Sequence, residues 1–265
     1  MFAKEDNKIN IQGGWKMTKH EQKTLERNSL YFQYWNRIMI KAMGALFAIC
    51  FSFTAVVGGE VVVNQTFEQD KHGSHGGWAR RYFSDKCSVM VTEAVASPGE
   101  GGQKSYMIQR HEDAKNGWLH MGFPRVEEPF ELSVDIKVER GTESFSLSIF
   151  SDWKAFIQLN YSGGEFKNGV GRGPGNLQSI TPIDPACWYR VKITVPNKIS
   201  EATEYNLVVG KFDESGKLMD VKEFNNLGIF KDSKVKDPHS FVSRLKIDIA
   251  PGGEVLIDNL IIKKL

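Results

Sequence analysis

Alternation of apolar and polar residues dominates the chain beyond residue 60. The stretch Phe130-Glu-Leu-Ser-Val-Asp-Ile-Lys-Val138 alternates through nine residues, and shorter stretches repeat the pattern. Successive side chains of a strand point to opposite faces, so this pattern predicts strands with one buried face. The shorter stretches are 145–149, 157–161, 189–195, 205–209 and 245–249. Helical periodicity is nearly absent, and the sequence therefore predicts an all-β protein.

Glycine-containing turn signals separate these predicted strands. They include Ser162-Gly-Gly164, Asn168-Gly169 and Pro251-Gly-Gly253. Many short strands with turns between them and no intervening helices are typical of an antiparallel sandwich or barrel. No Pro/Ser-rich linker interrupts residues 60–265, so we expect them to form one domain.

The alternation also sorts the predicted side chains by face. The polar set includes Asp135, Gln158, Asn160, Arg190 and Asp248. Two interpretations of this polar face stay open: a solvated outer surface, which every antiparallel sandwich has, or a groove that receives sugar hydroxyls. The apolar set, expected in the core, is Leu132, Val134, Ile136, Val138, Phe145, Leu147, Ile149, Ile157, Leu159, Val191, Ile193, Leu207, Leu245, Ile247 and Ile249.

An uncharged apolar segment precedes the predicted domain. Residues 42–59 carry no charged side chain and follow Arg37 and Lys41. A positive start, an apolar centre and small residues at the end predict a secretory signal peptide at 39–59. The alternative is an uncleaved membrane anchor. Residues 1–38 are a polar extension or a misassigned start, and a cleaved signal would leave a mature chain without a stable membrane span, secreted, at the cell surface or in the periplasm.

Charge is unevenly distributed along the sequence. The whole chain has a formal net charge of +2, but residues 1–59 hold 8 Lys/Arg against 4 Asp/Glu. The remaining residues hold 26 Lys/Arg against 28 Asp/Glu, so the predicted domain is slightly acidic. No basic stripe that would follow a phosphate backbone is visible, which argues against nucleic acid as a partner.

Export would leave Cys87 and Cys187 in an oxidising compartment. A disulfide between them is one possibility, and two unpaired thiols are the other, since sequence does not give the geometry of a bridge.

Four short motifs carry a family resemblance. They are Asn64-Gln-Thr-Phe-Glu68 followed by Gly77-Trp78, the segment 96–108, Cys187-Trp-Tyr-Arg-Val-Lys-Ile193 and Leu256-Ile-Asp-Asn-Leu-Ile261. In this order they resemble carbohydrate-binding modules of the family-4/9/22 type, which are galactose-binding-like or concanavalin-like β-jelly rolls. The resemblance implies a two-sheet antiparallel β-sandwich of the jelly-roll type that acts outside the cell.

The resemblance also implies a structural calcium ion. In such modules the acidic residue of the strand that carries the Phe-Glu pair, here 61–68, and the Asp of the last strand bind the ion, and loop carbonyls complete the set. The corresponding positions here are Glu68 and Asp258, with the carbonyl near Ser105 as the third contributor. Oxygen ligands of this kind are what calcium prefers in proteins.

Candidate glycan-binding residues come from the polar face, from loops and from the aromatic side chains. Sugars bind on aromatic surfaces flanked by hydrogen-bonding groups. Each Trp could instead pack inside the protein, and the family usually displays more aromatic side chains on the binding face than the alternation leaves here, because Tyr161 and Tyr205 fall on the core side. The candidates are Trp153, Gln158, Asn160, Asp135, Arg190, Arg172, Trp118 and Trp78.

Three functions are compatible with this pattern. The first is a secreted, non-catalytic, lectin-like protein that binds a polysaccharide or glycan. The second is a polysaccharide hydrolase or lyase on the same fold, which would be favoured if Asp135 and Asp248 shared one cleft. The third is a surface structural or adhesion domain without a sugar site, which would be favoured if the candidate tryptophans were all buried.

Overall fold

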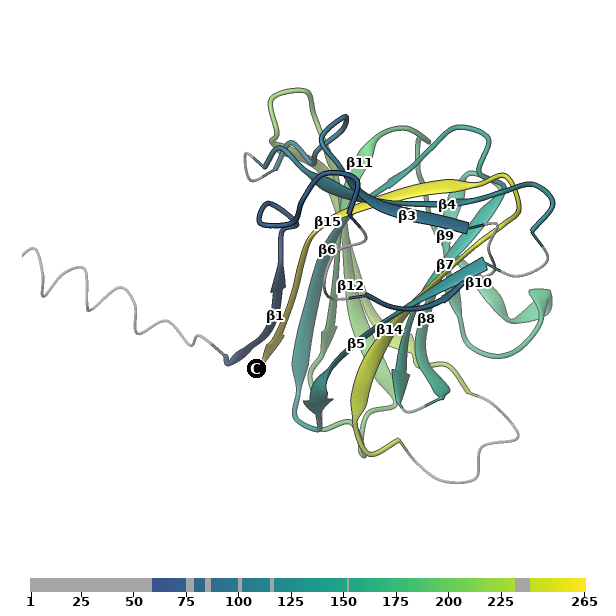
Figure 1. Ribbon diagram of the computed structural model, residues 1–265. Helices are drawn as coiled ribbons and strands as arrows, with labels where there is room; N and C mark the ends of the chain where they lie inside the picture. The colour runs from purple at the N-terminus through teal and green to yellow at the C-terminus, as the bar shows by residue number, and fades with distance from the viewer. Residues whose placement is uncertain are drawn as a thin grey trace, which may run out of the picture. The chain divides into compact units, whose positions relative to one another are not determined.

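The alternating stretches form strands, and the strands build two antiparallel sheets packed face to face (Figure 1). The computed structural model describes residues 59–74, 79–83, 87–99, 102–114, 117–151, 153–231 and 239–265. The stretch Gly59–Leu265 forms one compact unit. The predicted extension 1–38, nearly all of the predicted signal peptide and Trp78 lie outside the described residues.

The first sheet, sheet A, has eight strands in the order β13-β12-β11-β6-β15-β4-β3, with β1 also paired to β15. Its strands are β1 (Val61–Gln65), β3 (Cys87–Thr92), β4 (Ser105–Arg110), β6 (Phe130–Val138), β11 (Trp188–Val195), β12 (Glu204–Phe212), β13 (Leu218–Gly228) and β15 (Glu254–Lys264). Every pairing is antiparallel.

The second sheet, sheet B, has seven strands in the order β10-β9-β8-β7-β14-β5-β2. Its strands are β2 (Ala79–Phe83), β5 (Gly117–Val126), β7 (Ser144–Ser151), β8 (Lys154–Ser162), β9 (Glu165–Gly169), β10 (Leu177–Pro182) and β14 (Val242–Ile249). A short 3₁₀ helix, η1 (Pro174–Asn176), precedes β10. The Asn168-Gly169 pair, predicted as a turn, instead ends strand β9, where both residues pair with β10.

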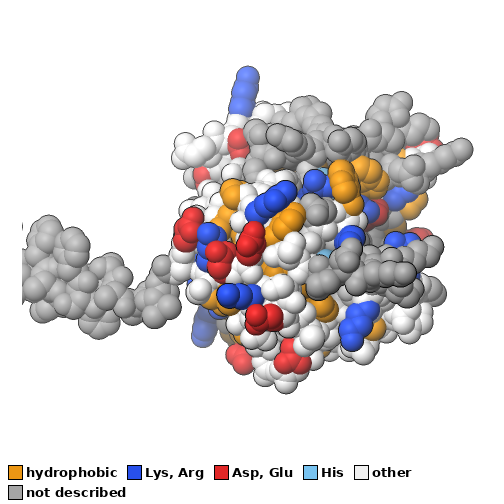
Figure 2. Space-filling view, turned by 90° about the horizontal axis from the view of Figure 1, so that it is seen from below, with side chains coloured by type: hydrophobic (Ala, Val, Ile, Leu, Met, Phe, Trp, Pro, Cys, Tyr) orange, Lys and Arg blue, Asp and Glu red, His pale blue; other side chains and the backbone are white. Residues whose placement is uncertain are grey.

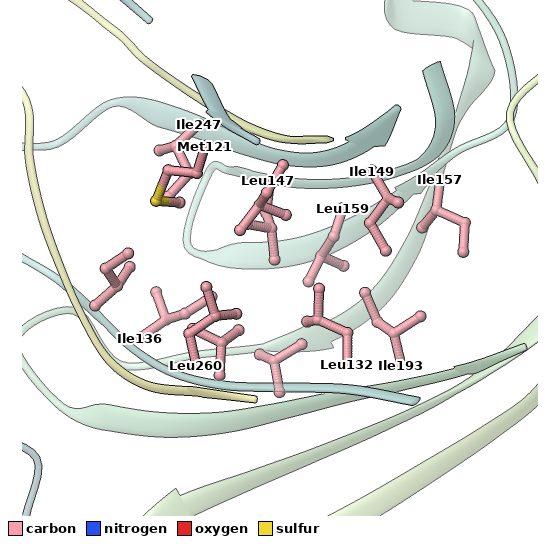
Figure 3. Close-up of a cluster of buried hydrophobic side chains, with 14 of the residues drawn as sticks. Met121, Leu132, Ile136, Leu147, Ile149, Ile157, Leu159, Ile193, Ile247 and Leu260 are labelled. Carbon is pink, nitrogen blue, oxygen red and sulfur yellow. The ribbon is translucent and has the colours of Figure 1, made fainter. Parts of the chain in front are cut away.

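The core lies between the sheets, and every side chain that the alternation assigns to it is buried. Figure 3 shows Met121, Leu147, Ile149, Ile157, Leu159 and Ile247 of sheet B pointing toward Leu132, Ile136, Ile193 and Leu260 of sheet A. Tyr161 and Tyr205 also lie inside, as predicted, and the Tyr205 hydroxyl donates to Asn168 Oδ1 at 3.0 Å. The predicted all-β, two-sheet antiparallel sandwich is therefore confirmed.

Strand β15 changes partner halfway along its length. Its first half pairs with β4 and its second half with β1, while β6 runs along its other edge. The change occurs at Asp258 and Asn259, where the register shifts and Asn259 takes a positive φ of 47°. Figure 1 shows the end of β15 beside β1. The bulge opens the sheet edge, and this is where the acidic residues of the predicted calcium site meet.

Strand β1 is shorter than the sequence suggested. It ends at Gln65, so Glu68 lies in the following turn rather than in a strand. Phe67 ends the extended conformation with a φ of 61°, and its buried ring stacks on Tyr106 with 5.0 Å between centroids. Burial of this aromatic ring outweighs the cost of a left-handed backbone at a non-glycine residue.

The surface mixes charges of both signs. Figure 2 shows Lys/Arg and Asp/Glu side chains interspersed over the face that it displays, in keeping with ion pairs such as Lys192–Glu131 and Lys264–Glu60. None of the helices in the described part of the chain has the length and apolar character needed to span a membrane.

Candidate functional site

Two rows of polar side chains cross the outer face of sheet B. Antiparallel pairing places Lys246 of β14 opposite His120 of β5 and Ser148 of β7, and Ser148 opposite Gln158 of β8. The neighbouring row is Trp118, Asp248, Ser146 and Asn160 on the same four strands. Strands lie about 4.8 Å apart, so each row is about 14 Å long.

Three adjoining hollows lie over these rows. The first, of about 400 Å³, is lined by Trp153, Gln158, Arg172 and Lys246 among others. The second and third have volumes of about 420 and 360 Å³, and Asn160 lines both. Gln158 and Arg172 line the first and the third, so the hollows form one continuous groove, which we call the sheet B groove.

A glycine makes room for the amides of this groove. A Cβ on Gly169 would lie 2.9 Å from Asn160 Nδ2 and 3.0 Å from Gln158 Oε1. The absence of a side chain on this strand therefore lets both amides lie over β9.

Trp153 is the most exposed large apolar side chain of the groove. It lies in the turn between β7 and β8 with 64% of its surface exposed. The Arg244 guanidinium lies over its ring, 3.9 Å from the centroid. A cation stacked on an aromatic face stabilises that ring orientation, so Arg244 supports Trp153 while the ring stays accessible.

His120 lies at the base of the same region. It is 5% exposed, and its ring contacts those of Trp118 and Trp153 with centroids 4.4 and 5.9 Å away. Within the described part of the chain, its Nδ1 has no hydrogen-bond partner. Burial, together with the positive charges of Lys246 and Arg244, lowers the pKa of His120 to about 4 against the opposing charge of Asp248. The imidazole is therefore neutral at pH 7.

Positive charge is concentrated around the groove. Among the described residues, its lining contains the cationic side chains of Arg110, Lys154, Arg172 and Lys246 and one carboxylate, Asp248. That carboxylate lies 3.0 Å from Lys246 Nζ and 3.9 Å from Arg110 Nη1. Aromatic surface, amide and hydroxyl groups and cations are thus combined on one face.

The single polar face expected from the alternation is in fact two faces on opposite sides of the sandwich. Asp135 and Arg190 belong to sheet A, whereas Gln158, Asn160 and Asp248 belong to sheet B. The prediction that Asp135 and Asp248 could share a cleft is therefore wrong, because two sheets about 10 Å apart separate them. The period-two pattern defines inside and outside, but it does not say which sheet a strand joins.

Asp135 is fully buried under the loop between β3 and β4. Its Oδ1 accepts from Arg190 Nε at 2.8 Å, and its Oδ2 accepts from Arg190 Nη2, Ser97 Oγ and Asn259 Nδ2 at 2.7–3.0 Å. The Arg190 guanidinium also lies over the Phe212 ring, 5.2 Å from the centroid. These contacts fasten the loop to sheet A, so the two residues do not line the sheet B groove with the other predicted ligand-binding residues.

The two predicted calcium ligands meet at the bulge of β15. A Cβ on Gly102 would lie 2.8 Å from Glu68 Oε1 and 3.8 Å from Asp258 Oδ2, so both carboxylates border the same small space. Glu68 Oε1 accepts from the backbone N–H groups of Gln103 and Lys104 at 2.9 and 2.8 Å. The turn after β1, the loop before β4 and the last strand therefore converge here.

Asp258 is a buried carboxyl group that is costly to ionise. Burial and the negative charges of Asp135 and Glu68 raise its pKa, the backbone N–H groups of Ser97 and Asn259 oppose the rise, and the net result is a pKa of about 7. The side chain is 1% exposed. A bound cation would favour the ionised form and remove this penalty.

Side chains alone do not complete a metal site. No group of three His, Cys, Asp or Glu side chains suited to a metal ion occurs within the described ranges. The residues present fit a hard cation only if backbone oxygens contribute, as calcium sites allow. Ser105, the third predicted contributor, is buried and its hydroxyl donates to the Val95 carbonyl.

Cys187 is a free, partly buried thiol. It lies at the start of β11, and β6, β15 and β4 separate that strand from β3, on which Cys87 lies. Four strand spacings amount to about 19 Å, far beyond the Cα separation of a disulfide. The structure therefore selects the alternative without a bridge.

Several groove residues were missed at the sequence level although the signal was present. His120 was not predicted, yet it follows the predicted candidate Trp118 at a spacing of two on β5, which puts both rings on the outer face. Strand β14 begins at Val242, three residues before the predicted start, which adds Arg244 to the face of Lys246.

Comparisons with known proteins give a likeness of fold. No protein-family model matches the sequence, and no curated protein does. A solved sialidase matches with TM-score 0.52 and 11% identity over 78% of this chain, which spans only 19% of the sialidase. The marine PL-14 alginate lyase from Aplysia kurodai matches with TM-score 0.50 and 11% identity, covering 77% of this chain and 99% of the lyase.

A carbohydrate-binding module is also among the solved structures that match. The CBM22-1 xylan-binding domain from Paenibacillus barcinonensis is 17% identical over 79% of this chain and 97% of that domain, with TM-score 0.35. A score this low carries no argument about family membership. The chain thus shares the fold of the alginate lyase and of the matched fifth of the sialidase, and its membership in the family-4/9/22 type stays a prediction.

Proposed function

We propose that the protein is a non-catalytic carbohydrate-binding β-sandwich whose sugar site is the sheet B groove. The observation that carries the proposal is the position of Trp153. Its exposed ring borders a hollow that also contains Gln158, Ser146 and Ser148. A sugar ring has apolar faces that stack on an indole and hydroxyls that need planar donors and acceptors, and this surface supplies both.

The fold agrees with this function but does not establish it. A protein of the same fold, the Aplysia alginate lyase, has a name that states a polysaccharide substrate. The predicted signal peptide at 39–59 would bring this chain outside the cytoplasm, where such polymers occur. A structural or adhesion domain without a sugar site was expected to bury its candidate tryptophans, and Trp153 is instead exposed.

A glycan panel tests the proposal. The purified full chain would be titrated against soluble polysaccharides and oligosaccharides, neutral and acidic, with calcium present. We expect saturable binding that Trp153→Ala and Gln158→Ala both weaken, whereas Met219→Ala, a truncation at an exposed position on sheet A, leaves it unchanged. Absence of binding across the panel, or equal effects of all three substitutions, would contradict the assignment.

A polysaccharide-degrading enzyme on the same groove is the second candidate. The observation that favours it is His120, a neutral imidazole opposite Lys246 whose Nδ1 has no partner among the described side chains and backbone groups. An imidazole that is neutral at pH 7 is the form that accepts a proton from a substrate, and its low pKa makes His120 a weak base. Product analysis on mixed polysaccharides tests this: shortened chains formed by the protein but not by His120→Gln would favour an enzyme, and intact polymer would favour binding alone.

For the bulge of β15 we propose a structural calcium ion held by Glu68, Asp258 and backbone oxygens. The raised pKa of Asp258 supports the proposal, because a carboxylate that is costly to ionise gains most from a cation. An ion at about a hundred times its dissociation constant stabilises the folded state by about 2.7 kcal/mol. A chelator should therefore lower the Tm by several degrees, and an unchanged Tm would contradict the proposal.

A further inference from the structure

The distribution of charge around the sheet B groove differs from that of the rest of the domain. Residues 60–265 hold slightly more Asp/Glu than Lys/Arg. Among the described residues, however, the groove is lined by four cationic side chains and one carboxylate, and Arg244 adds a further cation behind Trp153. A surface of one sign on a domain of the opposite net charge attracts ligands of the complementary charge.

The carboxylate does not cancel this charge. Asp248 lies between Lys246 and Arg110, at 3.0 and 3.9 Å, so two cations share one anion. Lys154 and Arg172 lie at the rim of the first hollow, and both are exposed. They are placed to meet a charged ligand, and Gln158 lines the same hollow.

An unpartnered donor adds to this pattern. Asn160 Nδ2 is buried and has no hydrogen-bond partner among the residues that the structure describes, and Asn160 lines the second and third hollows. A buried polar group of this kind is costly unless a ligand or water completes it. A carboxylate or sulfate oxygen would satisfy the amide and pair with a neighbouring guanidinium or ammonium group.

We infer that the groove selects anionic polysaccharides, which carry carboxylate or sulfate groups, over neutral ones. This inference rests on the proposed function, because it names the ligand class of the same site. Trp153 would contact the apolar face of a sugar ring, and Arg172, Lys154 and Lys246 would contact its acidic substituents.

Matched polymers distinguish carbohydrate binding from selectivity for anionic carbohydrate. Polygalacturonate and its fully methyl-esterified form share a backbone and differ only in charge, so their affinities for the purified full chain isolate the electrostatic part. Chondroitin sulfate carries sulfate groups in addition to uronate carboxylates, and polyglutamate is a polyanion without sugar. We expect polygalacturonate or chondroitin sulfate to bind at least about tenfold more tightly than the ester, with a difference that shrinks as salt rises.

Variants that remove charge test whether the cations of the sheet B groove cause this selectivity. The double substitution Lys154→Gln/Arg172→Gln should weaken binding of the acidic polymer about fivefold for each charge removed and leave binding of the ester nearly unchanged. The control Lys192→Gln/Lys217→Gln removes the same charge from sheet A and the β12–β13 turn and should change neither.

Each outcome has one meaning. Equal, salt-independent affinities for the acid and the ester would overturn the inference and leave the proposed function standing. Polyglutamate binding as tightly as the acidic glycans would also overturn it, because the surface would then be a general polyanion site. No binding of any polysaccharide would remove the proposed function and the inference together.

Discussion

Replacing Arg190 by Met tests whether the sheet A carboxylate is structural. Asp135 is fully buried, and the Arg190 guanidinium binds it through two nitrogens at 2.8 and 3.0 Å. Methionine keeps an unbranched apolar stem that can pack on Phe212, so the change removes charge more than volume. It leaves an uncompensated buried carboxylate beside Asp258.

The expected cost is large. Breaking a buried ion pair by removing one partner destabilises a protein by about 3–5 kcal/mol. For a domain of this size, each kcal/mol lowers the Tm by about 2–4 °C, which gives a fall of roughly 6–20 °C. Urea unfolding followed by tryptophan fluorescence measures the free energy directly.

Two controls make the prediction sharp. The double variant Asp135→Asn/Arg190→Met should recover most of the loss, because the amide needs no counter-charge. Lys211→Met, which breaks an exposed pair with Asp184, should cost less than about 1 kcal/mol. A loss in Arg190→Met as small as that in Lys211→Met, or no recovery in the double variant, would refute the reasoning.

The same variant bears on function. Arg190 lies on sheet A, and the groove lies on the outer face of sheet B, so the folded fraction of Arg190→Met should keep its affinity for glycans. Loss of binding by a folded Arg190→Met protein would move the sugar site to sheet A.

Three further predictions concern the bulge, a turn and the groove. With a chelator present, the free energy of unfolding should fall by at most about 4 kcal/mol as pH rises from about 4 to about 7, because the folded-state pKa of Asp258, about 7, exceeds its unfolded value and the cost of ionising it is complete only above pH 7. Saturating calcium should remove this fall in a pH series of urea titrations. An identical fall with and without calcium would argue against ligation by Asp258. Gly216→Ala should lower the free energy of unfolding by about 1–3 kcal/mol, because φ is +81° and the new Cβ would lie 2.2 Å from a carbonyl oxygen of the β3–β4 loop. A Tm within 1–2 °C of the parent protein would contradict this close approach. Gly169→Ala should lower glycan affinity in isothermal titration with little change in the free energy of unfolding, since its Cβ would displace the flexible amides of Gln158 and Asn160. Unchanged affinity would mean that these amides do not contact the sugar.

The local sequence pattern was sufficient to predict which face of a strand each side chain occupies. Alternation is local, and it placed Leu132, Ile193 and Ile247 in the core and Tyr205 with them, because a side chain's face follows from its parity along the strand. The order of turns and strands was sufficient for an antiparallel sandwich. Part of the groove was visible in the same way, since Gln158, Asn160 and Trp153 lie on the outer face of sheet B as expected.

The sequence by itself therefore determined the fold class, the buried face of the strands and the polar character of the outer faces. Only the tertiary structure decided which outer face each polar residue joins, because strand partners such as β6 and β15 are far apart in the chain and their pairing is not encoded in either strand alone. That pairing buried Asp135 on sheet A, brought Glu68 beside Asp258 at the bulge, and gathered His120, Arg244 and Lys246 around Trp153 on sheet B. The physical reason is that parity along a strand is set by the neighbouring residues, whereas membership of a sheet is set by backbone hydrogen bonds that form only when the whole chain has folded.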